Sequence, residues 1–441
     1  MKERMRFIVP LVIENLLSMS VTMIYSSLTG AISSSSLAAV SVGNQAIAML
    51  MTVLAAVVTG SAIIVARQTG KGDYGAASRT VEHTLLLSFS SGLVLTLALW
   101  AGTPLLMRLF MPGAEANFLW EGTVYFKINL ISIPVLVLGN SLSSVLRAVG
   151  DTRSAAVATF ISGSSQLIAV FILTDSRLLN LGIVGVAYSN VVCRYCSTAF
   201  LIWNVLKHTD RFCVDKKRIL KPDRENIGRI VRVGVPSSID SLAVQLGYVV
   251  INSLIVSQTL TVSVNSVMGA VLTFTGFFQS VGSNTATTFV GRAAGAGDMP
   301  GARKSALSIF FIAEILSLVL CIPVIVCPGF CAGLYTSDPD TLKEATRVLW
   351  LLIPYGVVAV GVNVADPAVR VGGDVKYVMR NTIICVWAIR LPLTYLFCLK
   401  LNMGAAGVYT ANIISLFCRT AASMYRINSP VWGKKEISAW K

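Results

Sequence analysis

Long runs of apolar residues dominate the pattern of this chain, and short polar segments separate them. Each run reaches roughly 20 residues or more, the length that an α-helix needs to cross a hydrocarbon core of ~30 Å. The pattern therefore predicts an all-α integral membrane protein with twelve transmembrane helices. The predicted spans are residues 7–28, 37–66, 83–106, 124–146, 155–174, 181–205, 231–257, 261–291, 306–327, 345–365, 377–398 and 404–425.

Polar residues in and between these runs occur in two copies, about 223–226 positions apart. The matched sets are Pro10 and Glu14 with Pro236 and Asp240, GKGD (70–73) with GAGD (295–298), LRAVGD (146–151) with VRVGGD (369–374), and LGIVGVAYSN (181–190) with MGAAGVYTAN (403–412). Such a period indicates a duplicated unit, and internal repeats are typical of secondary transporters, whose sites lie between the repeats. Six helices per copy is an even number, so the two six-helix lobes should be parallel and related by a pseudo-twofold axis.

The duplication predicts four parts in the chain. They are an N-lobe (1–206), a cytoplasmic linker between the lobes (207–228), a C-lobe (229–426) and a cytoplasmic tail (427–441). The linker carries both basic and acidic residues. We therefore interpret it as a solvated connection that lies on an anionic lipid surface, rather than as a binding site.

Composition and charge agree with a membrane protein. Hydrophobic residues make up 54% of the chain and charged residues 13%, whereas a soluble domain carries about 25% charged residues. The net charge is +15, and most Lys and Arg residues fall in loops on one side of the predicted topology. By the positive-inside rule, this distribution places both termini in the cytoplasm of a multi-pass cell (inner) membrane protein. It argues against a nucleic-acid partner, which would require the basic residues on one soluble face.

The repeated motifs resemble the multidrug and toxic compound extrusion (MATE) family. The similarity lies in the early prolines of the first and seventh helices, in GxGD after the second and eighth helices, in LRAVGDTRSA (146–155) and in WAIRLPLTYLF (387–397). It covers essentially the whole chain. The resemblance implies a twelve-helix, two-lobed exporter that exchanges Na⁺ or H⁺ for organic, often cationic compounds and uses no other cofactor.

The glycine-acid motifs have a structural interpretation. In GKGD, GAGD, LRAVGD and VRVGGD, glycine allows a tight turn, and the aspartate that follows can cap the next helix by accepting from its first N–H groups. We therefore expect hinge and docking elements here rather than ligands.

Coupling to an ion gradient requires an ion-binding group inside the membrane, where a carboxylate costs ~2.5–3.5 kcal/mol. Four acids meet this condition: Glu14, Asp240, Glu314 and Asp366. Glu14 and Asp240 are repeat-equivalent, one helical turn after a proline, and are the leading coupling candidates. The alternative is a structural bond to the backbone that the proline frees.

Asp366 stands four residues before Arg370, which predicts a pair along one helix face. Glu314 is either a lobe-specific feature or a surface acid.

Other polar residues within the spans are candidates for supporting roles. Arg390 and Arg194 are candidate charge partners for the acids. A substrate path between the lobes should carry polar side chains, because unpaired amides facing lipid are unfavourable. The path candidates are Tyr25, Asn44, Gln45, Gln245, Asn252 and Gln279. Hydrogen bonds between helices are the alternative for each of them.

Two positions depart from the family pattern. One branch of the family carries an aspartate about fifteen residues after the first proline, where this chain has Tyr25. Other branches place a glutamate eight residues after the proline of the seventh helix, where this chain has Val244. Neither ion site is carried over intact, so the choice between Na⁺ and H⁺ stays open.

We predict a secondary active exporter of organic, cationic and amphiphilic compounds, working as a monomer in the lipid bilayer. One alternative is a flippase for a lipid-linked saccharide, and another is a diverged member that is not coupled to an ion. An enzyme is not favoured, because a membrane enzyme requires clustered His, Asp or Cys residues, and His83 and His208 are the two histidines of the chain.

Overall fold

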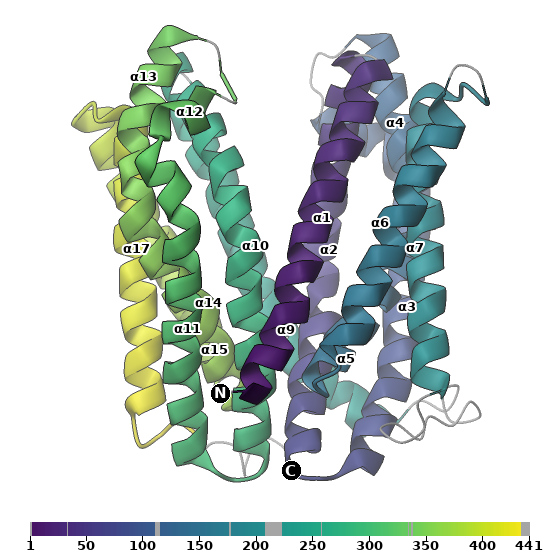
Figure 1. Cartoon of the computed structure of the whole chain (residues 1–441), viewed down its shortest axis with the longest axis vertical. Helices are drawn as coiled ribbons and strands as arrows, with labels where there is room; N and C mark the ends of the chain where they lie inside the picture. The colour runs from purple at the N-terminus through teal and green to yellow at the C-terminus, as the bar shows by residue number, and fades with distance from the viewer. Residues whose placement is uncertain are drawn as a thin grey trace. The chain divides into compact units, whose positions relative to one another are not determined.

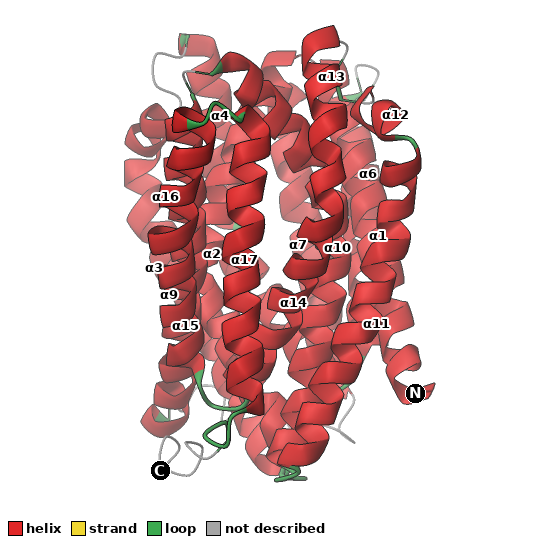
Figure 2. Ribbon diagram, turned by 90° about the vertical axis from the view of Figure 1, so that its left-hand side faces the viewer, coloured by secondary structure: helices red, strands yellow, loops and turns green. Residues whose placement is uncertain are grey.

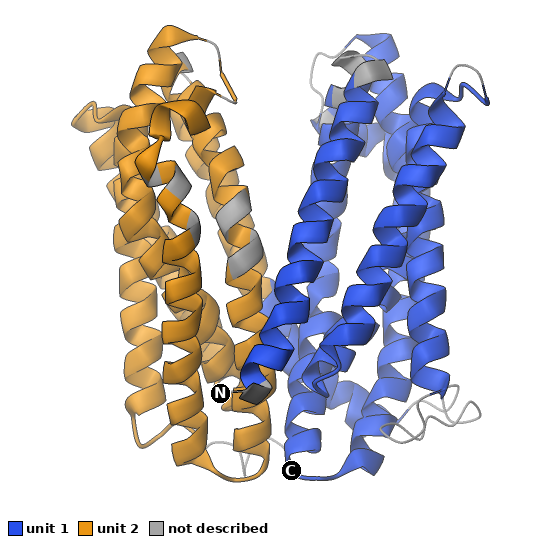
Figure 3. Cartoon of the chain, in the orientation of Figure 1, with its two compact units in different colours: residues 1–238 blue, residues 239–441 orange. Residues whose placement is uncertain are grey.

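The computed structural model describes residues 2–32, 34–110, 115–175, 178–207, 223–256, 258–333, 335–336 and 338–433. Within these residues the regular elements are helices, as the apolar pattern predicts (Figure 2). The chain divides into two compact units, Met1–Ser238 and Ile239–Lys441 (Figure 3). The lobe, linker and tail boundaries stay a prediction, and much of the linker (208–222) and of the tail (434–441) lies outside the described residues.

The first unit contains long helices in the order that the spans predict (Figure 1). They are α1 (Lys2–Ile32), α2 (Ser34–Gly70), α3 (Tyr74–Phe110), α4 (Ala116–Ile131), α5 (Ile133–Ala148), α6 (Thr152–Thr174) and α7 (Gly182–Lys207), followed by the first part of α9 (Arg224–Ile255).

The predicted span at 124–146 consists of two helices, α4 and α5, that meet at an angle of 55°. Ser132 stands at the break, and its backbone N–H and hydroxyl both donate to the carbonyl of Asn129, at 3.0 and 2.8 Å. Pro134 follows and has no N–H to continue the helical ladder, which accounts for a bend at this point.

The second unit repeats this order with more interruptions. Its elements are α10 (Thr259–Gly295), α11 (Met299–Val326), α12 (Pro328–Gly333), α13 (Pro339–Val348), η1 (Leu349–Leu351), α14 (Leu352–Val371), α15 (Val375–Ile383), η2 (Ile384–Arg390), α16 (Leu391–Thr394), η3 (Tyr395–Lys400) and α17 (Gly404–Asn428), after the second part of α9. The predicted span 377–398 contains two π-helical segments, η2 and η3, on either side of Pro392. Proline interrupts the regular ladder, so the wider turns adjoin it.

Seven helical segments of the described chain are long and apolar enough to cross a membrane, or eight when the bent pair counts as one span. Helices α7 and α17 are long enough, but each carries a buried asparagine and an arginine, namely Asn190 with Arg194 and Asn412 with Arg419. These side chains lower the mean hydropathy of the two helices and mark them as candidates for the interior of each unit.

The repeated turns have the geometry that their glycines predict. Gly72, Gly150, Gly297 and Gly373 have φ angles of 76°, 86°, 80° and 98°. This left-handed region costs glycine nothing, whereas a side chain there is strained.

Three of the four aspartates after these glycines cap the next helix, as predicted. Asp73, Asp298 and Asp151 accept hydrogen bonds from the backbone N–H groups three residues further on, at 2.8, 2.8 and 3.1 Å. For Asp374 the capping prediction is wrong. Its carboxylate accepts from Nε of Arg426 at 2.8 Å instead, because α17 brings a cation to this turn.

Small residues bring α9 close to α2 inside the first unit. A Cβ atom added to Gly234 would stand 2.0 Å from the carbonyl oxygen of Ala56, and one added to Gly60 would stand 2.5 Å from that of Ile230. Such spacing of small residues is how membrane helices let their backbones approach each other.

Candidate functional site: buried ion pairs and a polar cavity

The first unit holds a buried ion pair between α1 and α5. Oε1 of Glu14, one turn after Pro10, accepts a hydrogen bond from Nη2 of Arg147 and another from the hydroxyl of Thr159 at 3.1 Å. The side chains of Arg147 and Glu14 are 18% and 9% exposed. A charge at this depth is stable only when it is paired and hydrogen-bonded, and this pair meets both conditions.

The second unit holds the repeat-equivalent pair between α9 and α14. Oδ2 of Asp240 accepts a hydrogen bond from Nη2 of Arg370, and the two side chains are 4% and 16% exposed. The sequence placed Arg147 in a turn motif and predicted a pair of Arg370 with Asp366, and it predicted neither of these ion pairs. In the structure each arginine is the counter-charge of an acid from an earlier helix of the same repeat: Arg147 pairs with Glu14, and Arg370 pairs with Asp240.

A second arginine, Arg419 of α17, extends this network in the second unit. Its Nη2 lies 3.2 Å from Oδ1 of Asp240, and its Nε donates to Oδ2 of Asp366 at 2.8 Å. The hydroxyl of Ser423 donates a hydrogen bond to Oδ1 of Asp366 at 2.6 Å. The predicted pairing of Asp366 with Arg370 along one helix face is therefore wrong. Arg370 reaches across to Asp240, whose buried carboxylate requires a counter-charge, and Asp366 receives its own from α17.

The first unit has serines at the positions that correspond to this additional pair. Ser143 corresponds to Asp366 and Ser197 to Arg419, by their spacing to the matched residues of each repeat. A cavity of about 240 Å³ lies here between α1, α5, α6 and α7, and both serines line it. Its lining also includes Ser18, Thr22, Asn140, Thr159, Gln166 and Arg194.

Arg194 and Arg390 do not take the roles predicted for them, because neither joins an ion pair among the described residues. Arg194 lines the cavity and donates from Nη1 to the hydroxyl of Ser132 at 2.6 Å. Arg390 is buried and lies over the ring of Tyr248, 4.2 Å from its centre, where the π-face attracts the cation.

Glu314 of α11 differs from the three paired acids. Both of its carboxylate oxygens are buried, and neither accepts a hydrogen bond from the described residues. Its neighbours along the helix, Phe311 and Ile315, are 62% and 64% exposed, which indicates a face towards lipid. Of the four predicted acids, it is the one for which the described chain supplies no arginine.

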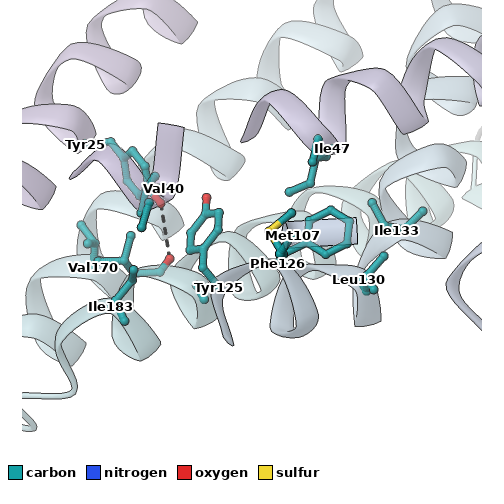
Figure 4. Packing of buried hydrophobic residues seen from close by; sticks show 14 of the residues in the cluster. Tyr25, Val40, Ile47, Met107, Tyr125, Phe126, Leu130, Ile133, Val170 and Ile183 are labelled. Atoms are coloured by element: carbon teal, nitrogen blue, oxygen red, sulfur yellow. Dashed lines mark hydrogen bonds between the residues drawn. The ribbon is translucent and has the colours of Figure 1, made fainter. Parts of the chain in front are cut away.

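Tyr25, which stands where one branch of the family has an aspartate, packs with Tyr125 in a buried cluster of the first unit (Figure 4). Its hydroxyl accepts from Nδ2 of Asn190 at 3.0 Å and lies 3.5 Å from the carbonyl oxygen of Val186, to which it donates. The same Nδ2 donates to the hydroxyl of Tyr125 at 2.8 Å. Two tyrosines and an amide thus fill the space with neutral groups that satisfy one another.

This network reaches one further path candidate and the cavity. Tyr125 donates to Oδ1 of Asn44 at 2.8 Å, and Gln166, which lines the cavity, donates to Oδ1 of Asn190 at 2.7 Å. No hydrogen bond of the described residues brings the other four candidates into this network. Gln279 accepts from Asn363 and Asn252 from Asn265 in the second unit, while Gln45 is exposed and Gln245 half-buried. Their role in a substrate path stays a prediction.

Sequence reasoning did not identify several residues of these networks, among them Arg147, Arg419, Tyr125 and Asn190. One signal was available: Arg147 and Arg370 recur with Glu14 and Asp240 in the same two copies, which indicates that acid and base meet in space. Tyr125 gave none, because its partners become neighbours only through the packing of α4 against α7.

Comparisons with known proteins agree with this fold. The sequence matches the MatE family over residues 10–172 and 236–396. A relative from Thermotoga maritima named "Probable multidrug resistance protein NorM" is 22% identical, over 99% of this chain and 94% of its own length. A relative from Staphylococcus aureus named "Multidrug export protein MepA" is also 22% identical, over 96% and 92%.

Solved structures of transporters superpose on nearly the whole chain. An outward-facing multidrug resistance MATE family transporter of the MOP superfamily gives a TM-score of 0.87 at 21% identity, covering 99% of this chain and 97% of that one. A MOP superfamily transporter from Pyrococcus furiosus also gives a TM-score of 0.87 at 21% identity, covering 99% of this chain and 96% of that one. Its structure carries the description "reverse polarity of binding pocket suggests different function". These matches confirm the predicted all-α fold of twelve helices in two six-helix lobes.

Proposed function

Because this chain belongs to the MatE family, we propose that it exports small organic compounds by secondary active transport, driven by the entry of Na⁺ or H⁺. The names of its relatives support multidrug export, and the chain covers nearly their whole length. The observation that carries the proposal is the pair of repeat-equivalent ion pairs, Glu14–Arg147 and Asp240–Arg370, inside helices that match a membrane transporter.

Binding of an entering cation at either ion pair would change the contact between the two helices that the pair joins. Oε2 of Glu14 is buried and accepts no hydrogen bond among the described residues, so it can take up a proton or contribute a ligand to Na⁺. Neutralising Glu14 in this way would remove the counter-charge that Arg147 has in this ion pair, and breaking a buried pair of charges costs about 3–5 kcal/mol. The contact between α1 and α5 would then rearrange. The same argument couples Asp240 to the contact between α9 and α14.

Glu314 is the second candidate for coupling. A carboxyl group without a counter-charge inside a membrane is stable only when it holds a proton or a cation. Its helix, α11, carries none of the paired acids of its unit, so Glu314 can be tested separately by mutation.

The orientation that we propose has both termini in the cytoplasm of the cell membrane, and the protein works as a monomer. The basic residues of the loops support this orientation, because Lys and Arg are retained on the cytoplasmic side.

The test is transport by the purified protein in proteoliposomes. A fluorescent organic cation, ethidium, is the substrate, and a Na⁺ gradient and a pH gradient are imposed separately. We expect one gradient to drive ethidium movement, and the double variant Glu14→Gln/Asp240→Asn to abolish it, because it removes both carboxylates and keeps their size. Glu344→Gln is the matched control, since Glu344 forms a pair with Arg347 that is largely exposed.

Full activity of the double variant would contradict the assignment of Glu14 and Asp240. Loss of coupling in Glu314→Gln alone would transfer the role to α11. Absence of ethidium movement under both gradients would favour the flippase or the uncoupled alternative.

A further inference from the structure

The cavity of the first unit contains a positive charge that no described carboxylate neutralises. Arg194 projects from α7 into the lining and makes one hydrogen bond to the described part of the chain, to the neutral hydroxyl of Ser132. The groups that interact with it electrostatically are Tyr25, Tyr125 and Cys193, all uncharged in their ordinary states. A guanidinium in a low-dielectric interior requires a counter-charge or several hydrogen bonds, and Arg194 has donors to spare.

Glu14 is linked to this cavity through Thr159, which both lines the cavity and donates to the carboxylate of Glu14. Its charge is matched by Arg147. Glu14, Arg147 and Arg194 together therefore leave one net positive charge, located at Arg194.

Comparison with the second unit shows that the residues at the positions of this cavity differ between the two repeats. Asp366 and Arg419 form an ion pair at the positions that correspond to Ser143 and Ser197. The position that corresponds to Arg194 is Leu416. One repeat thus has paired charges where the other has an open, polar, electropositive space.

We propose that this cavity binds the carboxylate of a small polar organic anion, with Arg194 as its counter-charge. A single guanidinium matches one carboxylate in charge and offers a two-pronged set of donors to its oxygens. A phosphate carries more charge than one arginine balances. At ~30 Å³ per water, the 240 Å³ cavity holds roughly eight waters, which suits a small hydroxy acid. The hydroxyls of Ser143 and Ser197 and the amide of Asn140 supply partners for its hydroxyl groups.

The proposal concerns binding and stands apart from ion-coupled export. Its test uses the full chain in lipid nanodiscs without any gradient, at constant ionic strength. The probes are L-lactate and D-gluconate, with neutral lactamide and inorganic phosphate for comparison. Affinity is measured by calorimetry and by the rise in Tm, because a ligand that binds only the folded state raises stability in proportion to its occupancy.

Four variants distinguish the contributions of the Arg194 charge, of the two-pronged geometry of its guanidinium and of the cavity volume. Arg194→Gln removes the charge, and Arg194→Lys keeps it without the fork. The double variant Ser143→Asp/Ser197→Arg copies the second repeat and fills the cavity. Arg390→Gln is the matched control, because it removes another buried arginine that makes no ion pair among the described residues.

We expect wild type and Arg390→Gln to bind at least one of the two carboxylates. Arg194→Gln should weaken that binding by roughly tenfold or more, since hydrogen bonds to a charged group are lost. Arg194→Lys should lie between them, and the cavity-filling variant should not bind. If that double variant fails to fold, Arg194→Gln decides.

The proposal is overturned if Arg194→Gln binds as tightly as wild type, if lactamide binds as tightly as lactate, if phosphate alone binds, or if no probe binds. Carboxylate binding without ethidium transport would uphold this site and contradict the proposed export. Ethidium transport without carboxylate binding would support the proposed export and contradict the carboxylate site.

Discussion

Arg419 carries a buried positive charge between two carboxylates, Asp240 and Asp366. All three side chains are 10% exposed or less. In such a cluster each charge is tolerated because of the others, so its removal costs more than the interactions it makes. The corresponding serines of the first unit show that the same helix packing also accommodates two neutral hydroxyls at these positions.

We predict that Arg419→Ser destabilises the protein by about 3–5 kcal/mol, because two carboxylates lose a common counter-charge. Adding Asp366→Ser should recover most of the loss, since the double variant reproduces the pair Ser143 and Ser197. Thermal unfolding in nanodiscs measures both. Arg347→Gln, at a largely exposed pair, should change stability little. A double variant less stable than the single one would show that the cluster is not held by charge balance.

At the scale of the elements, α9 depends on a small residue for its close approach to α2. Its backbone at Gly234 approaches α2 so closely that a methyl group would overlap the carbonyl of Ala56. Backbone atoms cannot turn away as a side chain can, so the helices would have to separate.

Gly234→Ala should therefore destabilise the protein by about 1–3 kcal/mol, the usual cost of overpacking. Gly228→Ala, six residues earlier on the same helix, has open space around its Cβ and should be neutral or slightly stabilising through helix propensity. Both are compared by Tm. Equal changes in Tm for Gly234→Ala and Gly228→Ala would contradict the close approach of α9 and α2.

Element prediction succeeded where it rested on length, apolar pattern and turn chemistry. The long spans, the glycines with positive φ and three of four aspartate caps follow from properties of a few neighbouring residues. It failed where distant segments decide. Asp374, for example, loses its capping role because Arg426 arrives from α17. Likewise, the acids were found from burial cost alone, but their arginine partners depend on which helices meet.

At the scale of the whole molecule, the positive-inside rule makes a prediction that does not depend on any site. If both termini are cytoplasmic, the turns at Asp73 and Asp151 lie inside the cell and the turn at Asp175 lies outside.

Truncated chains that end in alkaline phosphatase should accordingly be inactive after Asp73 and Asp151 and active after Asp175, because the enzyme folds only outside the cytoplasm. Fusions of green fluorescent protein at the same three points should show the opposite order. The reverse pattern for both reporters would invert the orientation and with it the direction of the ion gradient in the proposed mechanism.

The serines that stand where the other repeat has an ion pair have an evolutionary consequence. Duplication gives every ancestral position two descendants in one polypeptide, and each descendant is selected against its own neighbours. One descendant can keep a rigid electrostatic lock while the other is free to acquire a chamber for solutes. A fused gene can thus separate the tasks of support and selectivity, which a symmetric assembly of two identical chains would have to perform with one set of residues.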